Sequence, residues 1–141
     1  MHEKTEKWYE AIKVRRSRRS FEQSKIEKIK LERLAQAAEE LRNTIGGGRV
    51  AVIREHDGTV FSGMKGGYGV IKGPPSYLAF IADTTDPASY EKLGYTGESV
   101  VLEATTLELG TCWVSGTFDS SAAQRDLELG EHERLVAVSP L

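Results

Sequence analysis

The chain is poor in cysteine and has no long apolar run. Its 141 residues include one cysteine, Cys112, which cannot form an intrachain disulfide and therefore favours a reducing compartment. No apolar run approaches the ~20 residues that a membrane helix needs. The amino terminus is polar and lacks the apolar core of a signal peptide. These absences predict a cytoplasmic protein with no membrane partner.

Clustered histidines and a basic net charge are missing as well. The three histidines (His2, His56 and His132) are scattered through polar segments, which argues against a metal site. The formal net charge of −2 argues against a general affinity for nucleic acid. The sequence shows neither a nucleophile elbow nor a pair of acid–base carboxylates. If the protein is an enzyme, we therefore expect a cofactor to carry its chemistry.

The chain does contain enough apolar material for one folded domain, which we assign to residues 1–141. It is 39% hydrophobic and 28% charged, as is typical of a compact globular domain. The spacing of apolar residues predicts strands separated by helices, with one hairpin, and therefore an α+β fold. The predicted helices cover 4–16, 27–42, 86–109 and 120–128, and the predicted strands lie in 49–54, 60–62, 77–82, 112–114 and 134–139.

Residues 13–19 form a basic cluster at the end of the first predicted helix. They read Lys-Val-Arg-Arg-Ser-Arg-Arg. The arginine side chain offers forked donors that match phosphate oxygens, so the cluster suits a dianionic phosphate. A solvated charged face is the simpler alternative, and a nucleic-acid patch with salt-dependent binding is another.

A second segment, Gly110 to Phe118, reads Gly-Thr-Cys-Trp-Val-Ser-Gly-Thr-Phe. A strand that ends in Ser-Gly can bring backbone N–H groups close to a flat ligand, because glycine has no side chain to intervene. An ordinary strand and turn is the alternative, with Cys112 and Trp113 as packing residues. Residues 63–73 contain five glycines and predict a lid or crossing loop.

The order of several motifs resembles the FMN-dependent nitroreductase family. The most specific stretch is Gly94 to Ala104 followed by Leu109 to Gly116, which looks like the central dimer helix of that family and the strand after it. The resemblance also includes Ala11-Ile12, the run from Arg15 to Phe21, Ile26, Leu31–Ala38 and Lys72-Gly73-Pro74-Pro75. It implies a nitroreductase-like fold, with a mixed, mostly antiparallel central sheet flanked by helices and a long central helix at about 86–109.

The resemblance also implies a cofactor site and a reaction. Arg15, Arg16 and Ser17 would hold the phosphate and ribityl end of FMN, and Arg19 would lie near the pyrimidine edge of the flavin. Val114, Ser115 and Gly116 would lie along the ring, with a backbone N–H directed at N5. NADH or NADPH would deliver hydride to N5, and a nitroaromatic, quinone or similar small acceptor would then take two electrons. Family members are homodimers, so a second copy is the expected partner; a non-catalytic flavin-binding sensor or store is the alternative function.

Two departures from the family pattern are visible. Many family members follow the first long helix with an Asn-Gln-Pro-Trp-like segment that reaches the flavin, whereas residues 39–48 offer only Asn43. The family also usually continues past the last strand to a basic segment that closes on the phosphate. Here residues 135–141 read as a buried strand that runs to the end of the sequence. We therefore expect a domain truncated at its carboxyl end.

Overall fold

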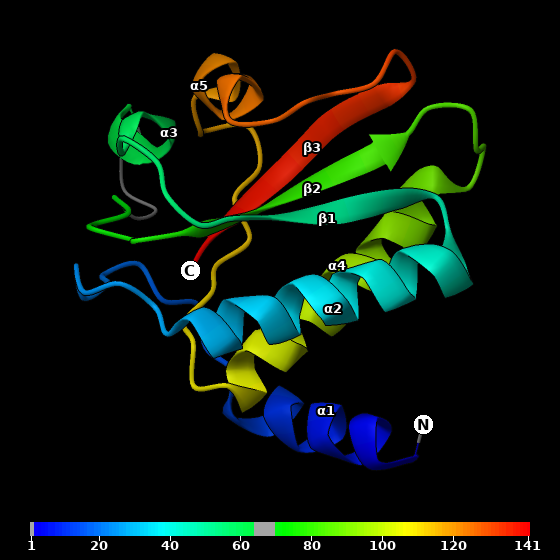
Figure 1. The fold of residues 1–141 in the computed structure, drawn as a ribbon, viewed down its shortest axis with the longest axis horizontal. Helices are drawn as coiled ribbons and strands as arrows, with labels where there is room; N and C mark the ends of the chain where they lie inside the picture. Colours follow the sequence, from blue (N-terminus) through cyan, green and yellow to red (C-terminus); the bar gives the residue numbers. More distant parts are fainter. Residues whose placement is uncertain (1, 64–69) are drawn as a thin grey trace.

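A three-stranded antiparallel sheet forms the centre of the fold (Figure 1). The computed structural model describes residues 2–63 and 70–141. Within these residues the sheet contains β1 (Gly48–Ile53), β2 (Tyr77–Asp83) and β3 (Glu133–Pro140), in the order β1-β2-β3. The strands predicted in 49–54, 77–82 and 134–139 are thus confirmed, as is the α+β class.

The middle strand, β2, supplies side chains to both faces of the sheet. Successive residues of a strand point to opposite sides. Leu78 and Phe80 pack on one face, and Tyr77 and Ile81 pack on the other. Residues 77–82 are completely buried, which explains why this strand reads as a continuous apolar run rather than an alternating one.

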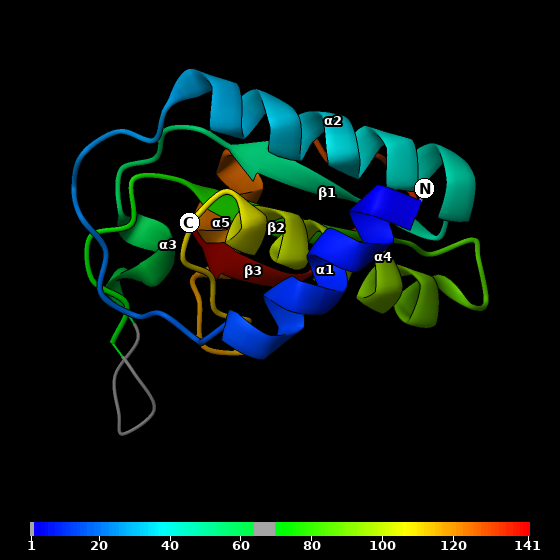
Figure 2. The same ribbon diagram turned by 90° about the horizontal axis from the view of Figure 1, so that it is seen from below.

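One face of the sheet is covered by long helices (Figures 1 and 2). α2 (Lys28–Ile45) and α4 (Ser89–Thr106) pack against the sheet, and α1 (His2–Val14) packs on α4. The indole Nε1 of Trp8 donates to Oε2 of Glu103 at 2.8 Å and joins α1 to α4. The buried residues between these layers are Leu31, Leu34, Ala38, Val50, Leu78, Phe80, Ala82, Leu93, Val100, Val101, Ala104, Ala137 and Leu141.

The opposite face of the sheet is covered by two short helices, α3 (Thr59–Ser62) and α5 (Ser120–Arg125) (Figure 1). Asp119 begins α5, because its carboxylate accepts a hydrogen bond from the backbone N–H of Ala122. The buried residues on this side are Val60, Phe61, Ile71, Tyr77, Ala79, Ile81, Cys112, Val114, Ala122, Ala123 and Val138. The sheet therefore separates two apolar clusters.

The predicted hairpin between 49–54 and 60–62 is wrong. Residues 59–62 form the helix α3, and β1 pairs with β2 instead. Gly58 adopts a φ of 87°, and Oδ1 of Asp57 accepts a hydrogen bond from the N–H of Thr59. These two features start a helical turn, and the turn buries the neighbouring side chains of Val60 and Phe61 together.

The central helix is present but shorter than the predicted 86–109. It begins at Ser89, after a turn in which the Asp86 carboxylate accepts hydrogen bonds from the Ala88 N–H and from Nζ of Lys92, a residue of the helix itself. It ends at Thr106, and Glu108 follows in a left-handed conformation with a φ of 61°. The predicted strand 112–114 makes only isolated bridges. The expected lid at 63–73 lies mainly outside the described residues.

Candidate functional site

The basic cluster and the Gly110–Phe118 segment lie side by side. A parallel bridge pairs Ser17 with Thr111, and the Arg18 N–H donates to the Thr111 carbonyl at 2.8 Å. The guanidinium Nη1 of Arg15 also reaches Oγ1 of Thr111, at 3.4 Å. Two segments that the sequence singled out separately thus meet at one place in the fold.

Residues 17–21 continue as an extended segment against a third piece of chain. The Phe21 N–H donates to the Lys72 carbonyl at 2.8 Å, and the Lys72 N–H donates to the Arg19 carbonyl at 2.7 Å. Residues 17–21 are thus held between Thr111 and Lys72 by backbone hydrogen bonds.

The arginines of the cluster differ in what they contact. Nη1 of Arg16 donates to the carbonyls of Lys13 (3.3 Å) and Arg15 (2.8 Å), so it satisfies acceptors at the carboxyl end of α1. Within residues 2–63 and 70–141, no carboxylate lies within ion-pair distance of the guanidinium groups of Arg15, Arg16, Arg18 and Arg19. Their positive charge is thus not neutralised by a described carboxylate and can interact with an anionic ligand.

Hydrogen bonds hold residues 112–114 against β3, and residues 115–116 lie past the last of these bonds. The Cys112 N–H donates to Oγ of Ser139 at 3.0 Å, and Val114 exchanges two backbone hydrogen bonds with Val138, at 2.8 and 3.0 Å. Val114 is buried, whereas Ser115 and Gly116 are exposed. In the described part of the chain, nothing accepts a hydrogen bond from the N–H groups of Ser115 and Gly116.

Gly116 meets the requirements of a residue that faces a flat ligand. Its φ is 82°, and a Cβ added to it would meet no atom within 4 Å. The segment from Thr111 to Gly116 thus contacts the arginine cluster at its first residue and offers unused N–H donors and open space at its last. These features fit FMN, which has a phosphate and a planar ring with hydrogen-bond acceptors.

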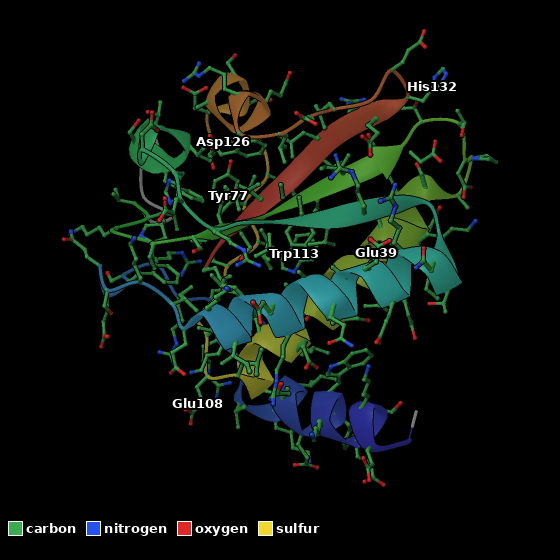
Figure 3. All side chains as sticks on the ribbon, in the orientation of Figure 1. Glu39, Tyr77, Glu108, Trp113, Asp126 and His132 are labelled. Atoms are coloured by element: carbon green, nitrogen blue, oxygen red, sulfur yellow. The ribbon has the colours of Figure 1, made fainter. Side chains whose placement is uncertain are left out.

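Trp113 points toward the helices and away from the short-helix side of the sheet. Its ring stacks on Phe80, with ring centroids 4.0 Å apart and an interplanar angle of 22°. Its Nε1 donates to Oε2 of Glu98 on α4 at 2.8 Å. Figure 3 shows Trp113 on the helical side of the sheet and Tyr77 and Asp126 on the opposite side. The sequence predicted packing for Trp113 but did not indicate a role for Glu98.

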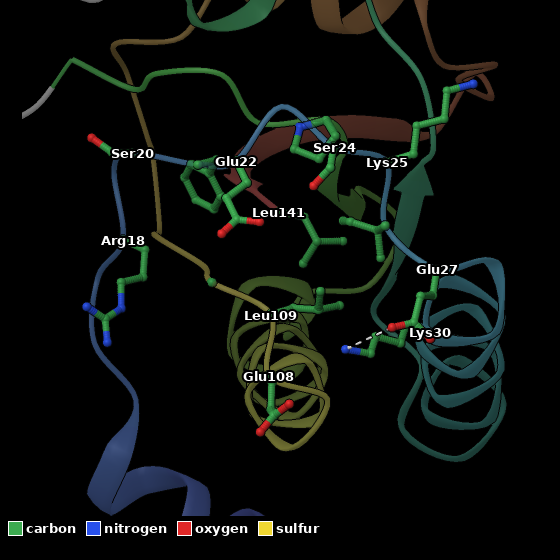
Figure 4. A pocket seen from close by; sticks show the side chains of 14 residues that line it. Arg18, Ser20, Glu22, Ser24, Lys25, Glu27, Lys30, Glu108, Leu109 and Leu141 are labelled. Atoms are coloured by element: carbon green, nitrogen blue, oxygen red, sulfur yellow. Dashed lines mark ion pairs between the residues drawn. The ribbon is translucent and has the colours of Figure 1, made fainter.

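A cavity of about 530 Å³ lies beside the site (Figure 4). Arg18, Ser20, Phe21 and Glu22 belong to its wall, whereas Arg15, Arg16, Ser17 and Arg19 do not. Its charged lining residues are three cations and three carboxylates: Arg18, Lys25, Lys30, Glu22, Glu27 and Glu108. This balance of charge does not suit a dianion. The phosphate candidate therefore remains the cluster at 15–19.

Two further findings on the described residues concern the requirements of a metal site and of a membrane-spanning helix. In the portions of the chain that the structure describes, no group of three or more His, Cys, Asp or Glu side chains is arranged to hold a metal ion. In the same portions, no helix has the length and apolar character required to cross a membrane.

Comparison with solved structures defines the fold class. A nitroreductase family protein from Clostridium novyi NT superposes with a TM-score of 0.73 at 23% identity, covering 94% of this chain and 82% of that chain. An FMN-dependent nitroreductase from Clostridium difficile R20291 superposes with a TM-score of 0.72 at 22% identity, covering 92% of this chain and 83% of that chain. Iodotyrosine deiodinase bound to FMN and 3-iodo-L-tyrosine superposes with a TM-score of 0.69 at 17% identity, covering 94% of this chain and 87% of that chain. The fold is therefore nitroreductase-like.

The family follows from the sequence itself. A family model described as "Putative TM nitroreductase" matches residues 7–139. The chain belongs to the nitroreductase family, which confirms the resemblance drawn from its motifs. None of the curated proteins compared with the chain matches it.

Proposed function

We propose that the chain binds FMN and works as an oxidoreductase that transfers electrons from NADH or NADPH to a small acceptor, such as a nitroaromatic compound or a quinone. Membership of the nitroreductase family supports an oxidoreductase. The observation that carries the proposal is the contact between the basic cluster and Thr111, which lies in the same segment as residues 114–116. In the proposal one FMN molecule spans the cluster with its phosphate and residues 114–116 with its ring.

In this proposal Arg15, Arg16 and Ser17 hold the phosphate and ribityl end, and Arg19 lies near the pyrimidine edge of the ring. Arg16 would exchange its backbone carbonyl contacts at the end of α1 for the phosphate. Hydrogen bonds from arginine to phosphate are charge-assisted and are stronger than those to a neutral carbonyl. The exchange therefore favours the bound state.

The segment 114–116 would lie along the ring. The backbone N–H groups of Ser115 and Gly116 are free to donate to it, and Val114 supplies the buried anchor. When bound, FMN supplies two-electron chemistry, and the protein contributes position and charge. The positive charge of Arg19 would stabilise negative charge that develops near the pyrimidine edge.

We also propose that the working form is a homodimer. Several large apolar side chains remain exposed on α1, on α4 and after α4, among them Tyr9, Ile12, Tyr95 and Trp113. Apolar groups grouped on a surface favour association with another surface. Sedimentation of the purified protein should give twice the mass of the 141-residue chain, and a monomer at all concentrations would contradict this.

Two measurements test the proposed function. The purified protein should show the absorbance of oxidised flavin, or acquire it with added FMN, and NADH or NADPH should bleach it without oxygen. A purified protein that contains no flavin and does not bind added FMN would overturn the proposal. A bound flavin that stays oxidised with both donors would instead favour the non-catalytic sensor or store.

A matched pair of variants tests the phosphate assignment. Arg15→Ala should raise the dissociation constant of FMN ~10–150-fold, which corresponds to one charge-assisted contact. Arg33→Ala removes an exposed arginine of α2 that makes no described ion pair, and it should leave FMN binding unchanged. The thermal unfolding of both apo-proteins should stay close to wild type. If Arg15→Ala lowers apo-protein stability as much as it weakens FMN binding, Arg15 is structural.

A further inference from the structure

Trp113 is held from three directions. Phe80 of β2 stacks on one side of its ring, and the Glu98 carboxylate accepts its indole N–H at 2.8 Å. The third contact is the backbone of α4 at Gly97. A Cβ added to Gly97 would lie 2.6 Å from Cη2 of Trp113 and 3.0 Å from the Phe80 ring. The indole therefore occupies the space that a side chain at position 97 would need.

Trp113 and Val114 anchor the chain to different layers of the fold. Val114 packs in the cluster on the short-helix side of the sheet, and Trp113 is fixed to α4 on the long-helix side. The two side chains leave the backbone in opposite directions, as neighbouring residues of an extended segment do. Together the two anchors fix both the position of the backbone and its rotation about its own axis.

Ser115 and Gly116 follow directly and have no comparable anchor. Both are exposed, and neither N–H donates to a residue in 2–63 or 70–141. The direction of these two N–H groups is therefore set by the residues immediately before them. If the contact at Trp113 is lost, the backbone before Ser115 keeps its pairing with Val138 but loses its attachment to α4.

We propose that Trp113 and Glu98 are positioning residues for the N–H groups of Ser115 and Gly116. This inference rests on the proposed function, because it assigns those N–H groups to the ring of FMN. Glu98 acts through the indole of Trp113, and its part is to accept a hydrogen bond rather than to supply charge. The hydrogen bond prevents the indole from turning on the Phe80 ring and so keeps the following backbone in one orientation.

Substitutions at Glu98 separate the hydrogen bond from the charge. Glu98→Ala removes the acceptor, and Glu98→Gln keeps a carbonyl oxygen that can accept from Nε1. Glu91→Ala removes an exposed carboxylate in the first turn of the same helix and is the matched control. The first readout is the backbone order parameter of Ser115 and Gly116 in the apo-protein, measured by nuclear magnetic resonance. The second is the dissociation constant of FMN.

We expect Glu98→Ala to lower the order parameters of Ser115 and Gly116 toward the flexible range, below about 0.6. It should also weaken FMN binding roughly 5–30-fold. Glu98→Gln and Glu91→Ala should match wild type in both readouts. Unchanged order parameters in Glu98→Ala, or a Glu98→Gln variant as impaired as Glu98→Ala, would overturn the inference.

The two readouts also distinguish the inference from the function on which it rests. If wild type does not bind FMN, the proposed function fails, and the order parameters alone decide whether Glu98 positions the segment. If wild type binds FMN and the order parameters fall without a change in affinity, the link between position and binding is wrong and the proposed function stands.

Discussion

The hydroxyl group of Tyr77 donates a hydrogen bond to Oδ2 of Asp126 across 2.6 Å, and it joins the middle strand of the sheet to the end of α5. The Tyr77 side chain is fully buried, and Asp126 is exposed. A buried hydroxyl needs such a partner, because an unpaired polar group inside a protein is destabilising. This bond is therefore part of what holds α5 against the sheet.

Replacing Tyr77 with phenylalanine should lower the free energy of unfolding by roughly 1.5–3 kcal/mol, the size of one hydrogen bond to a charged acceptor. The ring stays, so its contacts with His56 and Phe61 remain. Denaturant unfolding measures the change. Tyr90→Phe, at an exposed position on α4, is the control and should match wild type.

The same bond predicts a loss of stability in alkali. Burial, and then the hydrogen bond to Asp126, raise the pKa of Tyr77 well above its ordinary value of 10.0. The contribution of Tyr77 is therefore complete below pH 10 and is lost as the pH rises from there toward the folded pKa. Unfolding free energies measured across this range should fall in wild type, and the fall should be smaller in Tyr77→Phe. If the unfolding free energies of wild type and Tyr77→Phe fell equally with rising pH, Tyr77 would not be the group responsible.

Glu133 predicts a loss of stability in acid. The hydrogen bond from Arg49, and to a lesser extent one from the Gly130 N–H, hold the pKa of Glu133 below its ordinary value of 4.5. This contribution is complete above pH 4.5 and is lost as the pH falls through the folded pKa. Glu133→Gln should therefore be less stable than wild type at neutral pH and should lose less on acidification. Glu131→Gln, at an exposed neighbour, should follow the wild-type curve.

Gly97→Ala should destabilise the protein, although alanine favours helices. Its Cβ would lie within 3.0 Å of both the Trp113 and the Phe80 rings, and forced repacking of this kind costs roughly 1–3 kcal/mol. Gly94→Ala lies on the same helix with nothing within 4 Å, and should raise stability by up to about 1 kcal/mol. Thermal unfolding of the two variants compares them directly. Equal effects of the two substitutions would contradict the packing at Gly97.

Gly116→Val should abolish FMN binding under the proposed function, because the side chain would enter the space assigned to the ring. Gly116 has a φ of 82°, so valine also introduces backbone strain. Gly46→Val is the control, since Gly46 has a φ of 75° and equally open surroundings away from the site. Both variants should lose similar stability, and only Gly116→Val should lose FMN, as measured by fluorescence titration. Retained affinity in Gly116→Val would refute the assigned ring position.

The strongest sequence signals predicted the correct elements. Residues 77–82 are apolar throughout because β2 is buried on both faces, and 27–42 show helical spacing because one side of α2 faces the sheet. The prediction failed at Val60 and Phe61, where a turn followed by apolar residues suits a strand and a short helix equally. Local features start the helix here, namely the φ of 87° at Gly58 and the hydrogen bond from the Thr59 N–H to Asp57. Such local capping is difficult to distinguish from a hairpin turn in sequence.

The candidate site was only partly accessible to sequence. The chemical character of Arg15 and Gly116 can be read directly, because arginine and glycine have distinctive properties. The contact between the basic cluster and the Gly110–Phe118 segment depends on the pairing of Ser17 with Thr111, which no local pattern encodes. The Glu98–Trp113 hydrogen bond is likewise a tertiary contact that no local sequence pattern encodes. A glycine inside a helix can indicate close packing, as it does at Gly97, but Gly94 in the same helix has open surroundings, so the pattern alone does not identify the contact.

The contact between Arg15 and Thr111 joins residues 96 positions apart. At about 5–20 residues per second, a ribosome needs on the order of 5–20 s to add the residues between them. During this interval the basic cluster has already been synthesised, and its partner segment has not. Contacts of such long range also form slowly, because the chain must first be ordered between them. Any ligand that needs both segments is therefore captured only after synthesis has passed Thr111.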